Sequence, residues 1–142
     1  MRLYEKIRVI FIKFKNSLNT LKECYSDMVK AEDEKIKLYI QDSCIKRFEH
    51  TYEIAKKIMN KYLKKEYDKA EKDLTINNIF REMYGLNLIE NFENWTEYRL
   101  KRNITSHEYD LDKSGEILAI VPDFIADTKY LIDSLEKVLV DD

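Results

Sequence analysis

The stretch that decides the fold is residues 36–63, IKLYIQDSCIKRFEHTYEIAKKIMNKYL. Apolar or small side chains recur along it every three or four residues, with charged residues between them: Ile36, Ile40, Cys44, Phe48, Thr51, Ile54, Ala55, Ile58, Tyr62 and Leu63. This spacing is that of one face of an α-helix. It predicts a long amphipathic helix, followed by a charged segment, residues 64–73, that continues the helix or forms a loop.

A second stripe of the same spacing precedes this one and predicts another long helix. Its members are Leu3, Ile7, Ile10, Phe11, Phe14, Leu18, Leu21, Cys24, Tyr25 and Met28. The polar residues 31–34 separate the two helices. On the C-terminal side, a short helix is expected to begin at Thr75 or Asn77 and to run to about Tyr84. Gly85 is then expected at the left-handed position that often ends a helix.

Two more helices are expected after this point. Asn91 is a suitable N-cap for a fourth helix that carries Trp95 and Arg102. Residues 110–114 are interpreted as a turn, so the last helix is expected to begin at Asp112 or Ser114. Pro122 lacks a backbone donor and is expected to kink or split that last helix.

The composition supports a helical fold with few turns. Among 142 residues there are two Gly and one Pro, whereas sheet proteins need many turn residues. The length fits one domain that buries its own core. We therefore predict an all-α, up-and-down bundle of about five helices, with residues 1–142 forming a single domain and a shorter, irregular element before the last helix.

Charge and cysteine content narrow the class of function. The net charge is −2, so any binding of RNA must depend on a local patch of cations. Cys24 and Cys44 are too far apart for a zinc signature, and they are interpreted as buried, reduced thiols. We expect no metal and no cofactor. No signal peptide or membrane span is apparent, so a cytoplasmic protein is expected.

One octapeptide carries residues suited to chemistry: residues 102–109, RNITSHEY. His107 is of the residue type that gains and loses a proton near neutral pH. Arg102 offers a planar fork of donors for phosphate oxygens. Together they would cleave a phosphodiester: the His takes the proton of the ribose 2′-hydroxyl, and the Arg stabilises the charged transition state. The alternative is structural, with His107 as a cap or core residue and Arg102 in a surface ion pair.

The spacing of the two residues sets a geometric condition on this hypothesis. Residues five apart on an ideal helix differ in direction by roughly 140°. Arg102 and His107 would therefore act together only if the helix ends or distorts between them, if the Arg side chain reaches around, or if two subunits share a cleft.

Residues 95–110, WTEYRLKRNITSHEYD, resemble the signature of HEPN proteins, and more closely that of nucleotidyltransferase substrate-binding proteins, or HepT-type toxins. The family motif is an Arg, four residues, a His, any residue and a Tyr, with a polar residue after the Arg. Arg102, Asn103, His107 and Tyr109 match it without a gap. Residues 42–53, DSCIKRFEHTYE, resemble a second block of the family.

The resemblance implies a homodimer in which the motifs face a shared cleft. It also implies a partner, a minimal nucleotidyltransferase (MNT), that serves as antitoxin to a metal-independent RNase and can transfer AMP to the motif tyrosine, here Tyr109. Added bulk and charge on Tyr109 would exclude an RNA phosphate. An alternative for Tyr109 is simple packing against the last helix. The chain itself has no Gly-rich phosphate loop and no paired Asp motif, so the transferase centre is expected on the partner.

Further residues have a functional and a structural interpretation each. Arg47 and Glu49, in the second block, either line the cleft and orient Arg102 and His107 or form a surface ion pair. The lysines of residues 56–65 either guide RNA or form a solvated face. Tyr52 and Tyr98 either stack on a base or pack in the core, and core packing is favoured.

Three hypotheses about function follow. The first is an RNase toxin of a HEPN/MNT pair, with Arg102 and His107 catalytic, Asn103, Arg47 and Glu49 supporting, and Tyr109 modified. The second is a non-catalytic adaptor that presents substrate to the nucleotidyltransferase. The third is an inert helical bundle.

Overall fold

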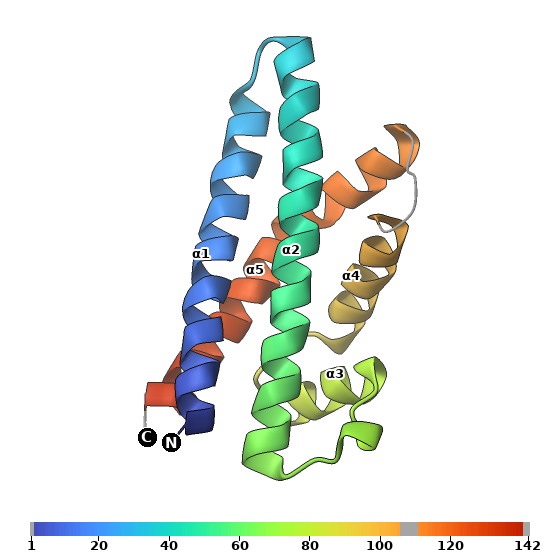
Figure 1. Ribbon diagram of the computed structural model, residues 1–142. Helices are drawn as coiled ribbons and strands as arrows, with labels where there is room; N and C mark the ends of the chain where they lie inside the picture. Colours follow the sequence, from blue (N-terminus) through green and yellow to red (C-terminus); the bar gives the residue numbers. More distant parts are fainter. Residues whose placement is uncertain (1, 106–110, 141–142) are drawn as a thin grey trace.

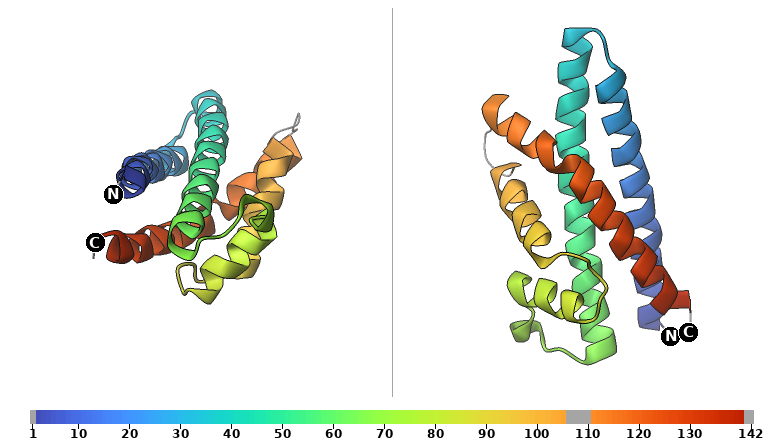
Figure 2. Two further views of the ribbon diagram at one scale, coloured as in Figure 1. Left: turned by 60° about the horizontal axis from the view of Figure 1, so that its bottom comes forward. Right: turned by 180° about the vertical axis from the view of Figure 1, so that it is seen from behind.

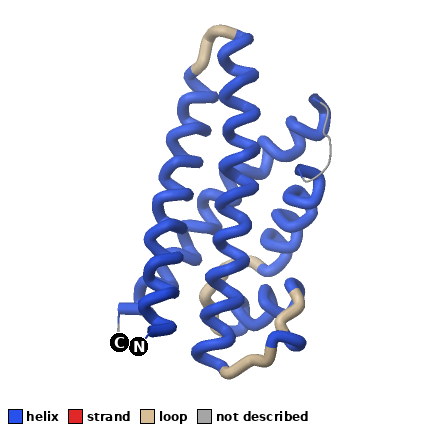
Figure 3. Tube along the Cα trace, in the orientation of Figure 1, coloured by secondary structure: helices blue, strands red, loops and turns tan. Residues whose placement is uncertain are grey.

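The protein is built from five α-helices, which the computed structural model describes over residues 2–105 and 111–140. They are α1 (Arg2–Lys30), α2 (Glu34–Tyr67), α3 (Ile76–Gly85), α4 (Phe92–Thr105) and α5 (Leu111–Val140), with a short 3₁₀ turn at Glu71–Asp73. Every regular element of the described part is helical (Figure 3). The prediction of an all-α fold of about five helices is confirmed.

Apart from the short α3, the helices run alternately up and down (Figure 1). α1 and α2 form a long antiparallel hairpin, and α4 and α5 form a second antiparallel pair beside it. The short α3 lies across the lower part of α2, below α4. Seen from behind, α5 crosses the hairpin obliquely and brings the C-terminus close to the N-terminus (Figure 2).

The ends of α2 follow from local capping. The Asp33 side chain accepts a hydrogen bond of 2.9 Å from the backbone N–H of Ile36, which is the usual role of an N-cap carboxylate. At the other end Asp68 adopts a left-handed conformation, with φ of 49°, and terminates the helix. The first part of the charged segment, as far as Tyr67, therefore continues α2, and the rest forms the connection to α3.

The end of α3 differs from the prediction. Gly85 is the last residue of the helix and has no positive φ; the left-handed residue is Asn87, with φ of 59°. Asn tolerates this conformation better than most residues with a side chain. Its side-chain oxygen also accepts a hydrogen bond of 3.2 Å from the Tyr130 hydroxyl of α5. The prediction for Gly85 was wrong because the chain turns two residues later.

The last helix also begins earlier than expected and is not split. Residues 111–114 belong to α5 instead of a turn, and the helix continues without a break through Pro122. Ile117, Val121 and Phe124 are all fully buried on either side of the proline. Burial of this stripe offsets the one backbone hydrogen bond that the proline removes.

The core joins side chains from all five helices in one cluster, including Phe14, Phe48, Phe80, Trp95 and Phe124. Cys44 is buried and Cys24 is half-buried, and both are free thiols. The Cys44 thiol donates to Cys24 Sγ at 3.2 Å, and burial raises the pKa of Cys44. Over the described residues, no helix is both long and apolar enough to cross a membrane.

Candidate functional site

The helix that carries the motif, α4, is fixed at its start by a side-chain cap. The backbone N–H of Asn94 donates to Asn91 Oδ1 at 2.9 Å, as the sequence predicted. One turn later Trp95 is fully buried. Trp95 therefore anchors the motif helix in the core.

Trp95 belongs to a group of rings that joins four helices. Its ring lies 5.4 Å from Tyr98, 5.8 Å from Phe124 and 5.9 Å from Phe80, measured between centroids. Phe48 of α2 meets Phe124 edge-on at 4.8 Å. Edge-to-face pairs at these distances add to the stabilisation from burial. The first half of α4 is thus held tightly against α2, α3 and α5.

Tyr98 adds a polar link to this apolar contact. Its hydroxyl donates to Asp127 Oδ2 of α5, and Asn94 Nδ2 donates to the same oxygen at 3.0 Å. Tyr98 and Asp127 are both buried. Burial, followed by the hydrogen bond to Asp127, raises the pKa of Tyr98. Tyr98 is therefore a core residue and has no free face on which a base would stack.

One turn beyond Tyr98, Arg102 lies against α2 with its side chain 20% exposed. Its Nη2 lies 3.6 Å from Glu49 Oε1, and its Nε lies 3.1 Å from Glu53 Oε1. Its Nη1 donates to Thr105 Oγ1 at 3.3 Å, and the Thr105 hydroxyl donates to the Arg102 carbonyl oxygen at 2.6 Å. Three groups therefore hold one guanidinium at the end of α4.

The contact with Glu53 is an ion pair and lacks hydrogen-bond geometry, so the buried Nε–H of Arg102 has no hydrogen-bond acceptor among the described residues. The hydroxyl of Tyr52, which is buried on the same part of α2, also has none. Burial raises the pKa of Tyr52, and the nearby Arg99 and Arg102 act in the opposite direction. Tyr52 packs in the core, so it too has no free face for a base.

The structure brings together some of the residues predicted for the site. Glu49 contacts Arg102 through an ion pair, which fits both of its interpretations. Asn103 is exposed on α4 next to Arg102. Arg47 is exposed on another face of α2, beside hollows shared with Asp42 and Cys24, and no described contact joins it to Arg102. His107 and Tyr109 lie outside the described residues.

Glu53 and Thr105 are contacts of Arg102 that the sequence analysis did not single out. Glu53 follows Glu49 by four residues, and this spacing places both carboxylates on one side of α2. Thr105 follows Arg102 by three residues on α4. Helical spacing from Glu49 therefore indicates Glu53 as a second carboxylate on the same face, and helical spacing from Arg102 indicates Thr105.

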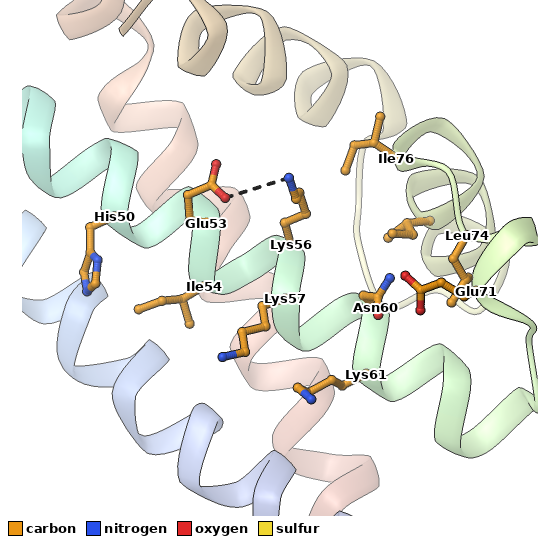
Figure 4. Close-up of a pocket in the computed structure, with 11 residues that line it drawn as sticks. His50, Glu53, Ile54, Lys56, Lys57, Asn60, Lys61, Glu71, Leu74 and Ile76 are labelled. Atoms are coloured by element: carbon orange, nitrogen blue, oxygen red, sulfur yellow. Dashed lines mark ion pairs between the residues drawn. The ribbon is translucent and has the colours of Figure 1, made fainter. Parts of the chain in front are cut away.

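A groove of about 600 Å³ lies beside this site (Figure 4). Its lining comes from α2 and from the segment that includes the start of α3: His50, Glu53, Ile54, Lys56, Lys57, Asn60, Lys61, Glu71, Leu74, Ile76 and Ile79. Lys56 pairs with Glu53 at 3.8 Å, and Lys64, just outside the lining, pairs with Glu71. Part of the predicted basic stretch of α2 therefore faces a common groove.

Comparisons with known proteins agree on one family. Residues 10–137 match the family model described as nucleotidyltransferase substrate binding protein like. A protein of Haemophilus influenzae named probable ribonuclease HepT is 32% identical over 96 residues. That alignment covers 66% of this chain and 65% of the relative, so it spans somewhat less than two thirds of the relative's length.

A solved structure gives the same fold. A protein of Haemophilus influenzae, described as having the fold of a substrate binding domain of a nucleotidyltransferase, superposes with a TM-score of 0.71 at 23% identity. The match covers 94% of this chain and 98% of that one. The helical arrangement described above is therefore shared over nearly the whole length of both proteins.

Proposed function

The chain belongs to the family of nucleotidyltransferase substrate binding proteins, and from this premise we propose that it is an endoribonuclease of the HepT type. In this proposal it is the toxin of a HEPN/MNT pair and cleaves RNA without a metal ion. The relative named probable ribonuclease HepT supports the reaction class. The observation that carries the proposal is the way Arg102 is held.

The contacts of Arg102 leave it donors for a phosphate. A guanidinium has five N–H groups. One Nη1–H donates to Thr105, while Nε and Nη2 lie beside Glu53 and Glu49 in ion pairs without hydrogen-bond geometry. Counting one N–H group for each of these three contacts leaves one on each terminal nitrogen, and the two terminal nitrogens can grip two oxygens of one phosphate. The carboxylates thus orient the side chain and leave part of its fork for substrate.

The chemical step would divide between Arg102 and His107. The imidazole of His107 takes the proton of the ribose 2′-hydroxyl, and the 2′-oxygen attacks the adjacent phosphorus. The bond from phosphorus to the 5′-oxygen of the next nucleotide breaks, and this oxygen takes up a proton. Arg102 stabilises the additional negative charge on the phosphoryl oxygens in the transition state. The products are a 2′,3′-cyclic phosphate and a 5′-hydroxyl.

Variants of the two residues test this mechanism directly. His107→Ala should abolish cleavage of RNA and toxicity while the helical content stays the same. Arg102→Lys should also lose most activity, because Lys keeps the charge and loses the two-pronged grip. Cleavage should continue in EDTA, and mass spectrometry should find the cyclic phosphate. A strict requirement for added magnesium would contradict the mechanism.

We further propose that two chains form the active unit, with their motifs facing one cleft. The aromatic residues Trp95 and Tyr98 of α4 are buried in the core of their own chain, so they are not available to a second one. Leu100, which is half exposed on α4, is the apolar side chain that α4 offers instead. Light scattering should give twice the mass of the chain at micromolar concentration. A monomer would contradict the shared cleft.

The partner in this proposal is a cognate nucleotidyltransferase that silences the RNase by adding AMP to Tyr109. Tyr109→Phe removes only the acceptor hydroxyl, so this variant should keep much of its activity and escape covalent control. The measurement is the intact mass of wild type and variant after co-expression with the partner. Equal AMP mass on both proteins would show that Tyr109 is not the target.

A second candidate function is a non-catalytic adaptor that presents substrate to the nucleotidyltransferase. The description of the similar solved structure as a substrate binding domain favours it. Expression of the chain without its partner separates the two functions. An RNase should arrest growth and fragment RNA, and both effects should disappear in His107→Ala. An adaptor should leave growth and RNA unchanged.

A further inference from the structure

We propose that the groove beside α2 binds the RNA strand next to the phosphate that Arg102 grips, with Lys57 and Lys61 contacting successive phosphates. This inference rests on the proposed function and adds to it the path of the substrate. It assigns a binding role to the residues of the groove, which the candidate catalytic pair does not include.

The charges of the groove favour an anionic ligand. The two carboxylates that line it already have cationic partners: Glu53 lies near Arg102 and Lys56, and Glu71 pairs with Lys64. Lys57 and Lys61 have no ion-pair partner within the described part of the chain. Their ammonium groups are therefore the uncompensated charges of the lining, although the chain as a whole is slightly acidic.

The spacing of these two lysines suits a single strand. They are four residues apart on α2, which corresponds to a rise of about 6 Å along the helix axis. Figure 4 shows their side chains on the same flank of α2, both directed away from the helix. This separation is comparable with that of neighbouring phosphates along an extended strand, so the two cations can each meet one.

The groove is continuous with the candidate catalytic site. Glu53 lines the groove and also lies 3.1 Å from Arg102 Nε. Lys57 follows Glu53 by four residues, and Lys61 follows by eight, along one ridge of the helix. Figure 4 shows Glu53 on one flank of α2 and Lys57 and Lys61 on the other, so a strand that places one phosphate on Arg102 meets Lys57 and then Lys61 as it crosses α2 along the groove.

The remaining lining is suited to bases of any sequence. Ile54 and Ile76 are half-buried at the groove, and Leu74 and Ile79 form buried parts of its wall. These side chains offer apolar contact to the faces of bases. No Phe, Tyr or Trp is found among the described lining residues, where the imidazole of His50 is the one ring, and stacking on such larger rings is the usual source of tight base contacts. We therefore expect affinity to come mainly from phosphates, with weak preference for sequence.

The test is binding of a fluorescent single-stranded RNA to the full chain, measured by anisotropy over a series of salt concentrations. His107→Ala serves as background, so that the RNA stays intact. In this background the double variant Lys57→Gln/Lys61→Gln should bind about tenfold more weakly at low salt, and the slope of log K against log salt should fall by about 1.4, or 0.7 per lost contact. The control is Lys30→Gln/Lys35→Gln, which removes two exposed lysines at the end of the α1–α2 hairpin.

Cleavage assays with the active chain separate this inference from the proposed function. The groove variant should raise KM for a long strand and leave kcat unchanged, because its lysines do not contact the reacting atoms. If wild type cleaves RNA and the groove variant matches the hairpin control in affinity, salt slope and KM, the inference is wrong and the RNase function stands. If wild type neither binds nor cleaves RNA, both are wrong.

Discussion

The two halves of α4 are held in place by different forces. In the first half, Trp95 and Tyr98 are buried among rings from three other helices and linked to Asp127. In the second half, Arg102 is held by Glu49 and Glu53, whose side chains are 25% and 43% exposed. The first half is held by packing of apolar surface that is removed from water, and the second half is held by ion pairs that water partly screens.

The difference shows how packing can fix a helix while ion pairs set the direction of one side chain on it, that of Arg102. Packing fixes the axis and rotation of α4 and contributes most of the stability. The ion pairs add little to stability at such exposure, but they set the direction of one guanidinium. Substitutions in the first half should therefore change the free energy of unfolding, and substitutions in the second half should change activity.

The largest effect is expected for Trp95→Ala. Removing a buried ring of this size leaves a cavity and should cost about 3–5 kcal/mol of unfolding free energy. Denaturation with urea, followed by circular dichroism, measures the loss. Trp95→Phe is the control, since it keeps a ring in the cluster and should cost less. Equal stability of Trp95→Ala and wild type would show that the first half of α4 is not anchored by packing.

The next largest loss of stability is expected at alkaline pH, through two buried tyrosines: Tyr98 in the packed half of α4 and Tyr52 on α2. Burial raises the pKa of Tyr98 and of Tyr52, whereas a tyrosine in the unfolded chain has a pKa of about 10. Below that pH both hydroxyls are protonated in either state and their contribution is fully present. As the pH rises above about 10, unfolding releases protons, so stability should fall by about 1.4 kcal/mol per pH unit for each tyrosine.

The variant Tyr52→Phe isolates one of these contributions. It removes a buried hydroxyl that has no described partner, so stability at neutral pH should change little. Its loss of stability above pH 10 should be smaller than that of wild type. Denaturation curves between pH 8 and pH 11 provide the comparison. An identical alkaline slope for both proteins would contradict the assigned pKa shift.

A smaller effect on stability, with a clear effect on activity, is expected for Glu53→Gln. The substitution keeps the shape of the side chain and removes its charge, so unfolding free energy should change by less than about 1 kcal/mol. Under the proposed function, cleavage should fall about tenfold, mainly in kcat, because Arg102 loses the carboxylate nearest its Nε. Faster cleavage would show instead that Glu53 competes with the phosphate.

The smallest effect is expected for Arg47→Ala. Arg47 is exposed and has no described contact with Arg102, whereas Glu49, two residues later, has one. Stability should stay within about 0.5 kcal/mol of wild type, and cleavage within about twofold. Parallel measurement of Glu49→Gln sharpens the contrast. A loss of cleavage in Arg47→Ala that matches Glu49→Gln would show that Arg47 supports the site as Glu49 does.

The long helices were predictable because their apolar stripes are regular. The stripe of residues 36–63 identified α2, and Asp33 and Asn91 were available as N-caps. The prediction was less accurate at helix ends, where local and tertiary effects compete. Residues 111–114 contain Asp and Ser, which favour turns, yet Ser114 is buried and packing extends α5 through them.

The candidate site was predictable in part, because the sequence motifs name residues but do not say how the helices pack. The motif drew attention to Arg102, and the second block drew attention to Glu49. Arg47 and Glu49 are equally close to Phe48 in sequence, but on a helix they point in directions that differ by roughly 160°. Which of them meets Arg102 depends on where α4 packs against α2, and that is decided by the ring cluster of Phe48, Trp95 and Phe124.

The ring cluster also provides a spectroscopic probe. Trp95 is the single tryptophan of the chain, and it is fully buried one turn before Tyr98 on the helix that carries Arg102. Its fluorescence should therefore have the short emission wavelength of an indole shielded from water. Circular dichroism is dominated by the long helices α1, α2 and α5, whereas the emission of Trp95 reports the ring cluster that holds α4 against its neighbours. Comparison of the two signals during unfolding distinguishes release of the motif helix from melting of the whole bundle.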